Sequence, residues 1–299
     1  MFCDINYVSA DKKIIKMAKG ISLHLGLNKV NPAHYAEWKG HLNAAEYDAK
    51  DMARLVKAYQ PNFETKILLS PNTEGYDLAT KDIVVSEITT AATRLVPNDL
   101  FVLTYSGHGG ILPNLNKDPE KPDYDYDQTY CLYDELLIDD EMIALWAKFK
   151  QGVRILVISD CCHSGSIVKI FDHSNLNEPC FRSKNVPDKA INDTYLAHKD
   201  YYDKILNARS IDPSDIKASL VSISACQDEE YTYDGDYNSE FTKCLKDVWN
   251  FGRFQGNYLN FHQNITFQIQ KIRSKQTPNY ITLGKPMDNF YKQKPFKIV

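Results

Sequence analysis

Two stretches of the 299-residue chain place residues capable of covalent chemistry directly after an apolar run. DLFVLTYSGHGG carries His108 between glycines, and VRILVISDCCHSG carries Asp160, Cys161 and Cys162. A thiol becomes a strong nucleophile when it ionises, and a neighbouring imidazole can take its proton or stabilise the thiolate. Backbone N–H groups in a glycine-rich turn can hold the oxyanion formed when a thiolate attacks a carbonyl. The two stretches therefore predict a Cys–His site with His108 and Cys162 as its catalytic residues.

The second cysteine of the pair is expected to be structural. Adjacent strand residues point to opposite faces, so Cys161 should face away from Cys162. A zinc site built from Cys161, Cys162, His163 and His108 is disfavoured, because adjacent cysteines chelate one ion poorly and the chain has no Cys-X-X-Cys pair.

Strand-like and helix-like segments alternate along the chain. Apolar, β-branched runs predict strands, and apolar residues at helical spacing predict helices. The expected strands are Lys19–Leu27, Phe63–Ser70, the run from Asp99 to His108, Thr129–Tyr133, Val153 to Cys162, Ser219–Cys226 and Tyr280–Leu283. The expected helices are Asn43–Tyr59, Thr80–Leu95, Asp139–Lys150, Glu240–Trp249 and Asn260–Ile272. This alternation favours an α/β fold, a sheet between helical layers, with active residues at strand carboxyl ends.

Two segments read as irregular. Ile111–Asp127 is rich in Pro, Asn, Asp and Lys and predicts a surface loop beside the site. Phe171–Arg209 has no sustained period and predicts a connecting loop with one or two helical pieces.

Composition excludes several function classes. The net charge is −4 with scattered basic residues, so no nucleic-acid-binding surface is expected. No apolar run reaches 18 residues and no secretory signal opens the chain, so we expect no membrane span. Seven cysteines in a chain of this size favour free thiols and a cytoplasmic, reducing compartment.

The two motifs resemble the paired motifs of the caspase-like cysteine peptidases, and are closer to metacaspases and bacterial orthocaspases than to animal caspases. The resemblance implies a three-layer α/β/α sandwich around a mostly parallel sheet of six to eight strands. It implies one peptidase domain over 1–299, with a large-subunit-like part at 19–170, a connecting loop at 171–210 and a small-subunit-like part at 211–299. It also implies His108 and Cys162 as the catalytic pair and an oxyanion hole from the N–H groups of Gly109 and Cys162.

Two aspartates are implied as specificity residues. LNAAEYDAKDM resembles the family segment that supplies one acid of the primary specificity pocket, which corresponds to Asp48, with Asp51 as the competitor. Asp160, two residues before the nucleophile, corresponds to the other acid. Two acids in one pocket would attract Arg or Lys before the scissile bond.

Members of the family that this sequence resembles often bind calcium through several aspartates. Asp139 and Asp140 resemble part of its site, but they are also simply first-turn acids of a helix. Lys169 stands where the family has another aspartate, and a lysine removes a ligand and adds repulsion. We expect no required cofactor.

The resulting prediction is a cysteine endopeptidase that cleaves protein or peptide substrates after Arg or Lys. The resemblance implies a regulated protease of stress, cell-death or antiphage signalling, with an activating partner or small signalling ligand. The alternatives are a catalytically silent signalling or scaffold protein on the same fold, and a peptide ligase.

Overall fold

A computed structural model describes residues 18–71, 75–115, 126–162, 183–208, 211–227 and 230–298. The central element is a seven-stranded sheet in the order β10-β9-β8-β4-β1-β2-β3, in which only β10 runs antiparallel to its neighbour. Its strands are β1 (Gly20–Leu27), β2 (Phe63–Ser70), β3 (Asp77–Leu78), β4 (Leu100–Ser106), β8 (Arg154–Asp160), β9 (Ser219–Ser224) and β10 (Asn279–Gly284). The prediction of a mostly parallel sheet of six to eight strands is confirmed.

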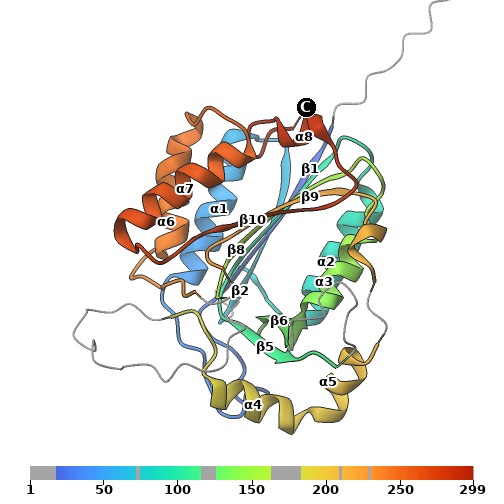
Figure 1. Cartoon of the computed structure of the whole chain (residues 1–299), viewed down its shortest axis with the longest axis vertical. Helices are drawn as coiled ribbons and strands as arrows, with labels where there is room; N and C mark the ends of the chain where they lie inside the picture. The colour runs from blue at the N-terminus through green and yellow to red at the C-terminus, as the bar shows by residue number, and fades with distance from the viewer. Residues whose placement is uncertain are drawn as a thin grey trace, which may run out of the picture.

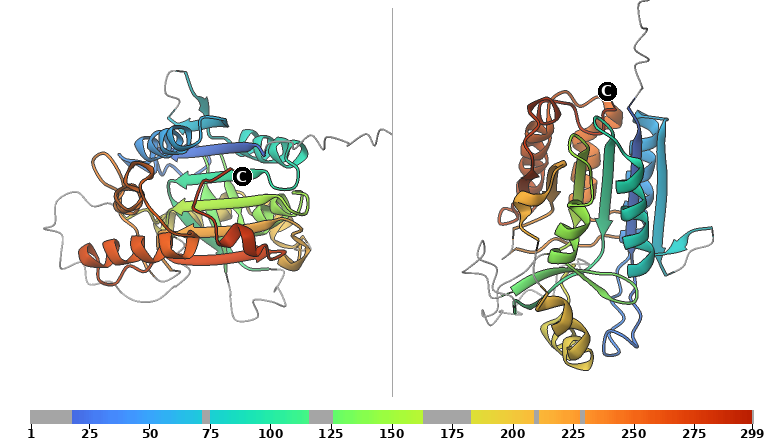
Figure 2. Two further views of the ribbon diagram at one scale, coloured as in Figure 1. Left: turned by 90° about the horizontal axis from the view of Figure 1, so that it is seen from above. Right: turned by 90° about the vertical axis from the view of Figure 1, so that its right-hand side faces the viewer.

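Helices cover both faces of this sheet (Figure 1). One layer holds α1 (Ala45–Tyr59), α6 (Glu240–Trp249) and α7 (Tyr258–Ile272), and the other holds α2 (Lys81–Arg94) and α3 (Asp139–Trp146). The short elements η1 (Pro213–Asp215), η2 (Asn250–Gly252) and α8 (Asp288–Tyr291) complete the main body. The three-layer arrangement is also visible from the side and from above (Figure 2).

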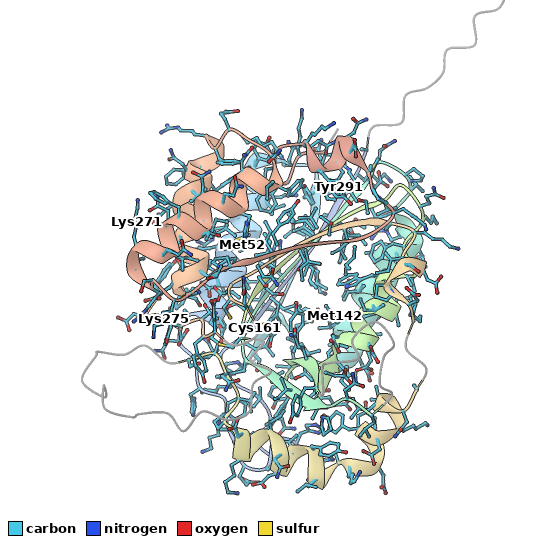
Figure 3. All side chains as sticks on the ribbon, in the orientation of Figure 1. Met52, Met142, Cys161, Lys271, Lys275 and Tyr291 are labelled. Atoms are coloured by element: carbon cyan, nitrogen blue, oxygen red, sulfur yellow. The ribbon has the colours of Figure 1, made fainter. Side chains whose placement is uncertain are left out.

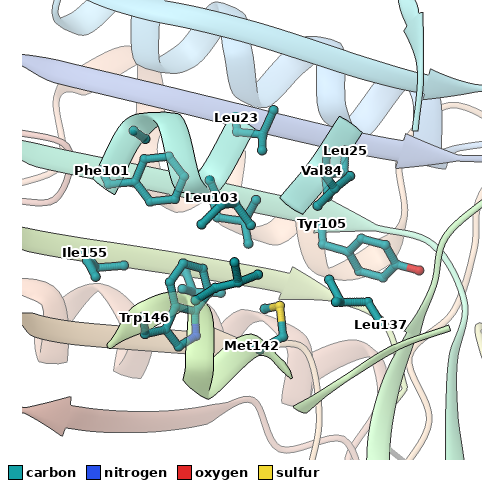
Figure 4. Packing of buried hydrophobic residues seen from close by; sticks show 14 of the residues in the cluster. Leu23, Leu25, Val84, Phe101, Leu103, Tyr105, Leu137, Met142, Trp146 and Ile155 are labelled. Atoms are coloured by element: carbon teal, nitrogen blue, oxygen red, sulfur yellow. The ribbon is translucent and has the colours of Figure 1, made fainter. Parts of the chain in front are cut away.

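The buried strands explain why the sheet forms the core. Every residue of β4 and β8 is buried, as expected for central strands of a parallel sheet covered on both faces. Along β4, Phe101, Leu103 and Tyr105 face the layer of α2 and α3, where Trp146 and Met142 pack against them (Figure 4). The other face of the sheet packs on α1, α6 and α7.

A second, smaller structure lies below the carboxyl ends of the parallel strands. It is a three-stranded antiparallel sheet, β5 (Gly109–Pro113), β6 (Tyr126–Cys131) and β7 (Leu136–Ile138). Beneath it lie α4 (Asp188–Ala197) and α5 (Lys199–Leu206), which share a third apolar cluster with this sheet (Figure 1). The small sheet and the two helices thus cover the carboxyl ends of the parallel strands.

This region corrects one prediction and agrees with another. The predicted loop Ile111–Asp127 is wrong at both ends, since β5 runs on to Pro113 and β6 begins at Tyr126. Only about half of the residues in β5 and β6 are apolar, so the sequence pattern did not predict that these ends of the segment form strands. Helices α4 and α5 match the helical pieces expected within Phe171–Arg209, of which residues 171–182 and Arg209 lie outside the described residues.

No helix among the described residues is long and apolar enough to cross a membrane.

A buried histidine in the central sheet makes stability sensitive to acid. His24 on β1 is fully buried, its Nδ1 lies 2.8 Å from the Thr104 hydroxyl, and burial lowers its pKa to about 3. In the unfolded chain His24 becomes protonated below about pH 6.5, whereas in the folded chain it becomes protonated only below about pH 3. Acidification through this window should destabilise the fold by about 1.4 kcal/mol per pH unit from this residue alone.

We expect His24→Gln to flatten the decline in unfolding free energy between pH 7 and pH 5, measured by urea titration at each pH. His41→Gln, at an exposed histidine, is the matched control and should leave the decline unchanged. Equal slopes for the wild type and His24→Gln would contradict this account.

Candidate active site

The carboxyl ends of β4 and β8 bring the two predicted catalytic motifs together. The strands are adjacent and parallel, with Ser106 opposite Asp160, so the residues that follow leave the sheet at the same edge. Gly109 lies so close to Cys162 that a Cβ at this position would stand 1.8 Å from the Cys162 carbonyl oxygen. A residue without a side chain is thus required where the two backbones meet.

The Cys162 thiol is buried and surrounded by hydrogen-bonding groups. Its Sγ accepts a hydrogen bond from the Thr232 N–H at 3.1 Å and lies 3.7 Å from the Ser183 hydroxyl. Burial acts to raise the pKa of this thiol, but hydrogen bonds from Cys226, Thr232 and Ser183 and the charge of Lys184 lower it below its ordinary value. The site therefore favours the thiolate, which is the reactive form.

His108 is held as a neutral imidazole. Its ring is buried and packs edge-on against Trp38 at a centroid distance of 4.7 Å. Burial, reinforced by the charge of Lys184, lowers the pKa of His108 to about 3, so its ring is unprotonated at neutral pH. No hydrogen bond joins this ring to the Cys162 thiol within the part of the chain described. The carbonyl of His108 accepts hydrogen bonds from the Tyr105 hydroxyl and the Cys131 N–H, which fix the turn.

The structure brings Asp48 and Asp160 together in one buried pocket. Both aspartates are 1% exposed as whole residues. Asp160, at the end of β8, accepts hydrogen bonds from the N–H and hydroxyl of Thr242 at 3.1 and 2.6 Å. Asp48, on α1, accepts from Ser106, Ser239 and Asn238. These hydrogen bonds fix both carboxylates in position on the side of the sheet covered by α1 and α6.

The cation in this pocket is Lys184, a fully buried residue of the same chain. Its Nζ lies 3.0 Å from Asp160 Oδ1 and 3.5 Å from Asp48 Oδ2. Burial acts to lower the pKa of this ammonium, but the two carboxylates raise it above its ordinary value. For Asp48, burial and the nearby Asp160 raise the pKa even though Lys184 opposes them. The pocket is thus built to hold one positive charge.

The backbone around Lys184 is extended and hydrogen-bonded on both sides. Its N–H donates to the Thr232 carbonyl at 3.1 Å, and its own carbonyl accepts from the Gly109 N–H at 3.0 Å. Two residues further along, the Val186 N–H donates to the Gly109 carbonyl at 3.0 Å. The Lys184–Asn185 peptide bond therefore lies beside Gly109, with its carbonyl on that glycine's N–H and the Lys184 side chain in the acid pocket.

Asp51, the alternative pocket acid, and Cys161, the alternative thiol, lie away from the acid pocket and from the Cys162 thiol. Asp51, on the same helix as Asp48, pairs with Arg54 and Lys246 outside the pocket. Cys161 faces the opposite side of the sheet and packs with the core residues under α2 and α3. Figure 3 shows it at the lower end of the sheet, where the strands end. Its pKa is raised by burial, which keeps this thiol protonated.

The two candidate calcium residues begin a helix. Asp139 and Asp140 lie in the first turn of α3, where the helix dipole favours acids. No group of three or more His, Cys, Asp or Glu side chains suited to a metal occurs within the described residues. His163 and Lys169 lie outside those residues.

Sequence reasoning missed several contributors to the site. Lys184 is one of the basic residues of the predicted connecting loop that the sequence offers as sites of self-cleavage, but nothing in the loop distinguishes it from the others or predicts its place in the pocket. Thr232 and Thr242 carry no motif, and they reach the site because the segment after β9 and the start of α6 fold over the strand ends. Trp38 comes from the loop after β1, far from His108 in sequence.

Comparison with known proteins supplies independent evidence on the family. The model of the caspase domain matches residues 30–288. Metacaspase-1 of Meyerozyma guilliermondii is 24% identical over 253 residues, which are 75% of this chain and 59% of that protein. Metacaspase-1A of Aspergillus fumigatus is 30% identical over 159 residues, which are 50% of this chain and 36% of that protein. The chain therefore spans less than two thirds of the length of these relatives.

Two solved structures are similar to this chain. Protein GSU0716 from Geobacter sulfurreducens is 40% identical, with a TM-score of 0.82, and covers 94% of this chain and 99% of its own. Caspase-1 from Spodoptera frugiperda is 10% identical with a TM-score of 0.54, covering 93% of this chain and 92% of its own, a similarity of fold alone.

Proposed function

Because the chain belongs to the caspase domain family, a family of cysteine peptidases, we propose that it is an endopeptidase that cleaves peptide bonds after Lys or Arg. The proposal rests on the position of Lys184 in the site. Its ammonium lies between Asp48 and Asp160 while its carbonyl accepts from the Gly109 N–H beside Cys162. A basic substrate residue bound in the same way would present its carbonyl to the thiolate.

The proposed mechanism uses the two motif residues in turn. The Cys162 thiolate attacks the carbonyl carbon, and the Gly109 N–H donates to the oxyanion that develops. His108, whose ring is neutral beforehand, takes the proton of the Cys162 thiol as the thiolate forms and passes it to the leaving amine as the C–N bond breaks. A water molecule then attacks the thioester and gives a proton to His108, and the carboxylic acid leaves as the thiolate re-forms.

The geometry supports Lys184–Asn185 as a bond that the protein cuts in itself. The ion pairs of Lys184 and the hydrogen bonds on either side of it hold this bond across the site. An uncut Lys184 also occupies the pocket and competes with any other substrate. The same residue would thus be both the first substrate and an inhibitor in the intact chain.

The test of the proposed function is a peptide-library digest read by mass spectrometry, with and without calcium. We expect products that end in Lys or Arg, and no calcium requirement, since Lys169 stands where the resembling family has another aspartate. Products ending in other residues would refute the pocket assignment, joined peptides would indicate a ligase, and no cleavage would favour a silent scaffold. The biological role implied by the resemblance, in stress, cell-death or antiphage signalling, stays a prediction.

A further inference from the structure

The geometry points to a pocket that selects Lys over Arg, with Ser106 as the residue that closes its end; this inference rests on the proposed function. Ser106 is the last residue of β4 and is 3% exposed. Its hydroxyl lies 2.8 Å from Lys184 Nζ and donates to Asp48 Oδ2 at 2.7 Å. The bond to Asp48 fixes the serine oxygen in front of the ammonium.

The acceptors around the ammonium match its three N–H groups in number. Three oxygens lie within 3.0 Å of Lys184 Nζ: the Ser106 hydroxyl, the Asp160 carbonyl and Asp160 Oδ1. Asp48 Oδ2 follows at 3.5 Å and adds charge rather than a short hydrogen bond. An ammonium has three donors and no acceptor, so this cradle satisfies it fully.

Arginine is too long for the same cradle. Its guanidinium carbon is as many bonds from Cα as the lysine Nζ, and its terminal nitrogens lie about 1.3 Å further out. With the backbone held by Thr232 and Gly109, those nitrogens would have to fit among three oxygens, the Ser106 hydroxyl included, that stand only 2.8 to 3.0 Å from the position of Nζ. An arginine could enter only if Ser106 or the peptide backbone moved.

The carboxylates also lack the arrangement that arginine prefers. A guanidinium binds best when one carboxylate offers both oxygens to its planar fork. Asp160 Oδ2 is occupied by Thr242, and Asp48 Oδ1 by Asn238 and Ser239. Each acid therefore directs one oxygen into the pocket, which suits a point charge better than a fork.

The experiment compares kcat/KM for two reporter peptides that differ only in Lys or Arg before the scissile bond. Lys184 competes equally with both peptides, so the ratio of the two constants measures discrimination by the pocket. We expect the wild type to favour the Lys peptide by at least about tenfold. Ser106→Ala should lower this ratio by about tenfold, because it removes one ammonium acceptor and makes room for the guanidinium.

Ser159→Ala is the matched control, since Ser159 is a buried serine beside Asp160 that bonds Tyr130 on the other face of the sheet. It should leave the Lys-to-Arg ratio unchanged. A wild type that cuts the Arg peptide as well as the Lys peptide overturns the inference while the proposed function stands. Cleavage of neither peptide overturns both. If Ser106→Ala does not fold, the wild-type ratio decides alone.

Discussion

Asp160→Asn is expected to lower kcat/KM for a Lys-ended reporter peptide by about a thousandfold. The substitution keeps the size of the side chain but leaves the buried ammonium without its nearest charged partner. Removing one member of a buried ion pair costs about 3–5 kcal/mol, because the remaining charge stays desolvated and uncompensated. Steady-state hydrolysis of the reporter by both proteins measures the effect.

Asp51→Asn is the matched control for this prediction. Asp51 is also a largely buried aspartate in ion pairs, but its partners are Arg54 and Lys246 and it lies outside the pocket. We expect its kcat/KM to stay within about threefold of the wild type. If Asp160→Asn were as active as Asp51→Asn, Asp160 could not be the acid that recognises the basic residue.

Cys162→Ala is expected to reduce peptide cleavage by about ten-thousandfold or more, to the background of the assay. Alanine offers no group that can attack a carbonyl, and His108 and Gly109 alone cannot form the thioester. The same reporter assay checks this result, with circular dichroism and thermal unfolding to show that the variant is folded.

The adjacent thiol provides the control. Cys161→Ala removes a buried sulfur from the core under α2 and α3, which should lower stability by about 1 kcal/mol and leave most of the activity. Loss of activity in Cys161→Ala together with retention in Cys162→Ala would reverse the assignment of the nucleophile.

The sequence predicted the parts of this site that depend on local pattern. The apolar runs before His108 and Cys162 are long enough to specify buried strands, and parallel strands place their carboxyl ends at one edge. Strand alternation likewise separated Cys161 from Cys162. Those rules needed no knowledge of contacts between distant segments.

Other parts depend on contacts that no local pattern encodes. Asp48 and Asp51 are three residues apart on one helix and share a face, so periodicity could not distinguish the pocket acid from its neighbour. Lys184 is one of several basic residues in a polar linker, and only the fold places it between two carboxylates from different elements. The hairpin of β5 and β6 was predicted only in part, as the strand Thr129–Tyr133, because β5 begins with two glycines and β6 begins with polar residues, so neither forms a continuous apolar run.

Lys184 gives the site its most direct test. Intact-mass measurement of the purified wild-type chain over time should show two fragments separated after Lys184, while Cys162→Ala should stay whole. This result would show that the site treats Lys184 as a substrate and that Cys162 performs the cleavage. The same cut in Cys162→Ala, or a wild-type chain that is never cut after Lys184, would contradict the account.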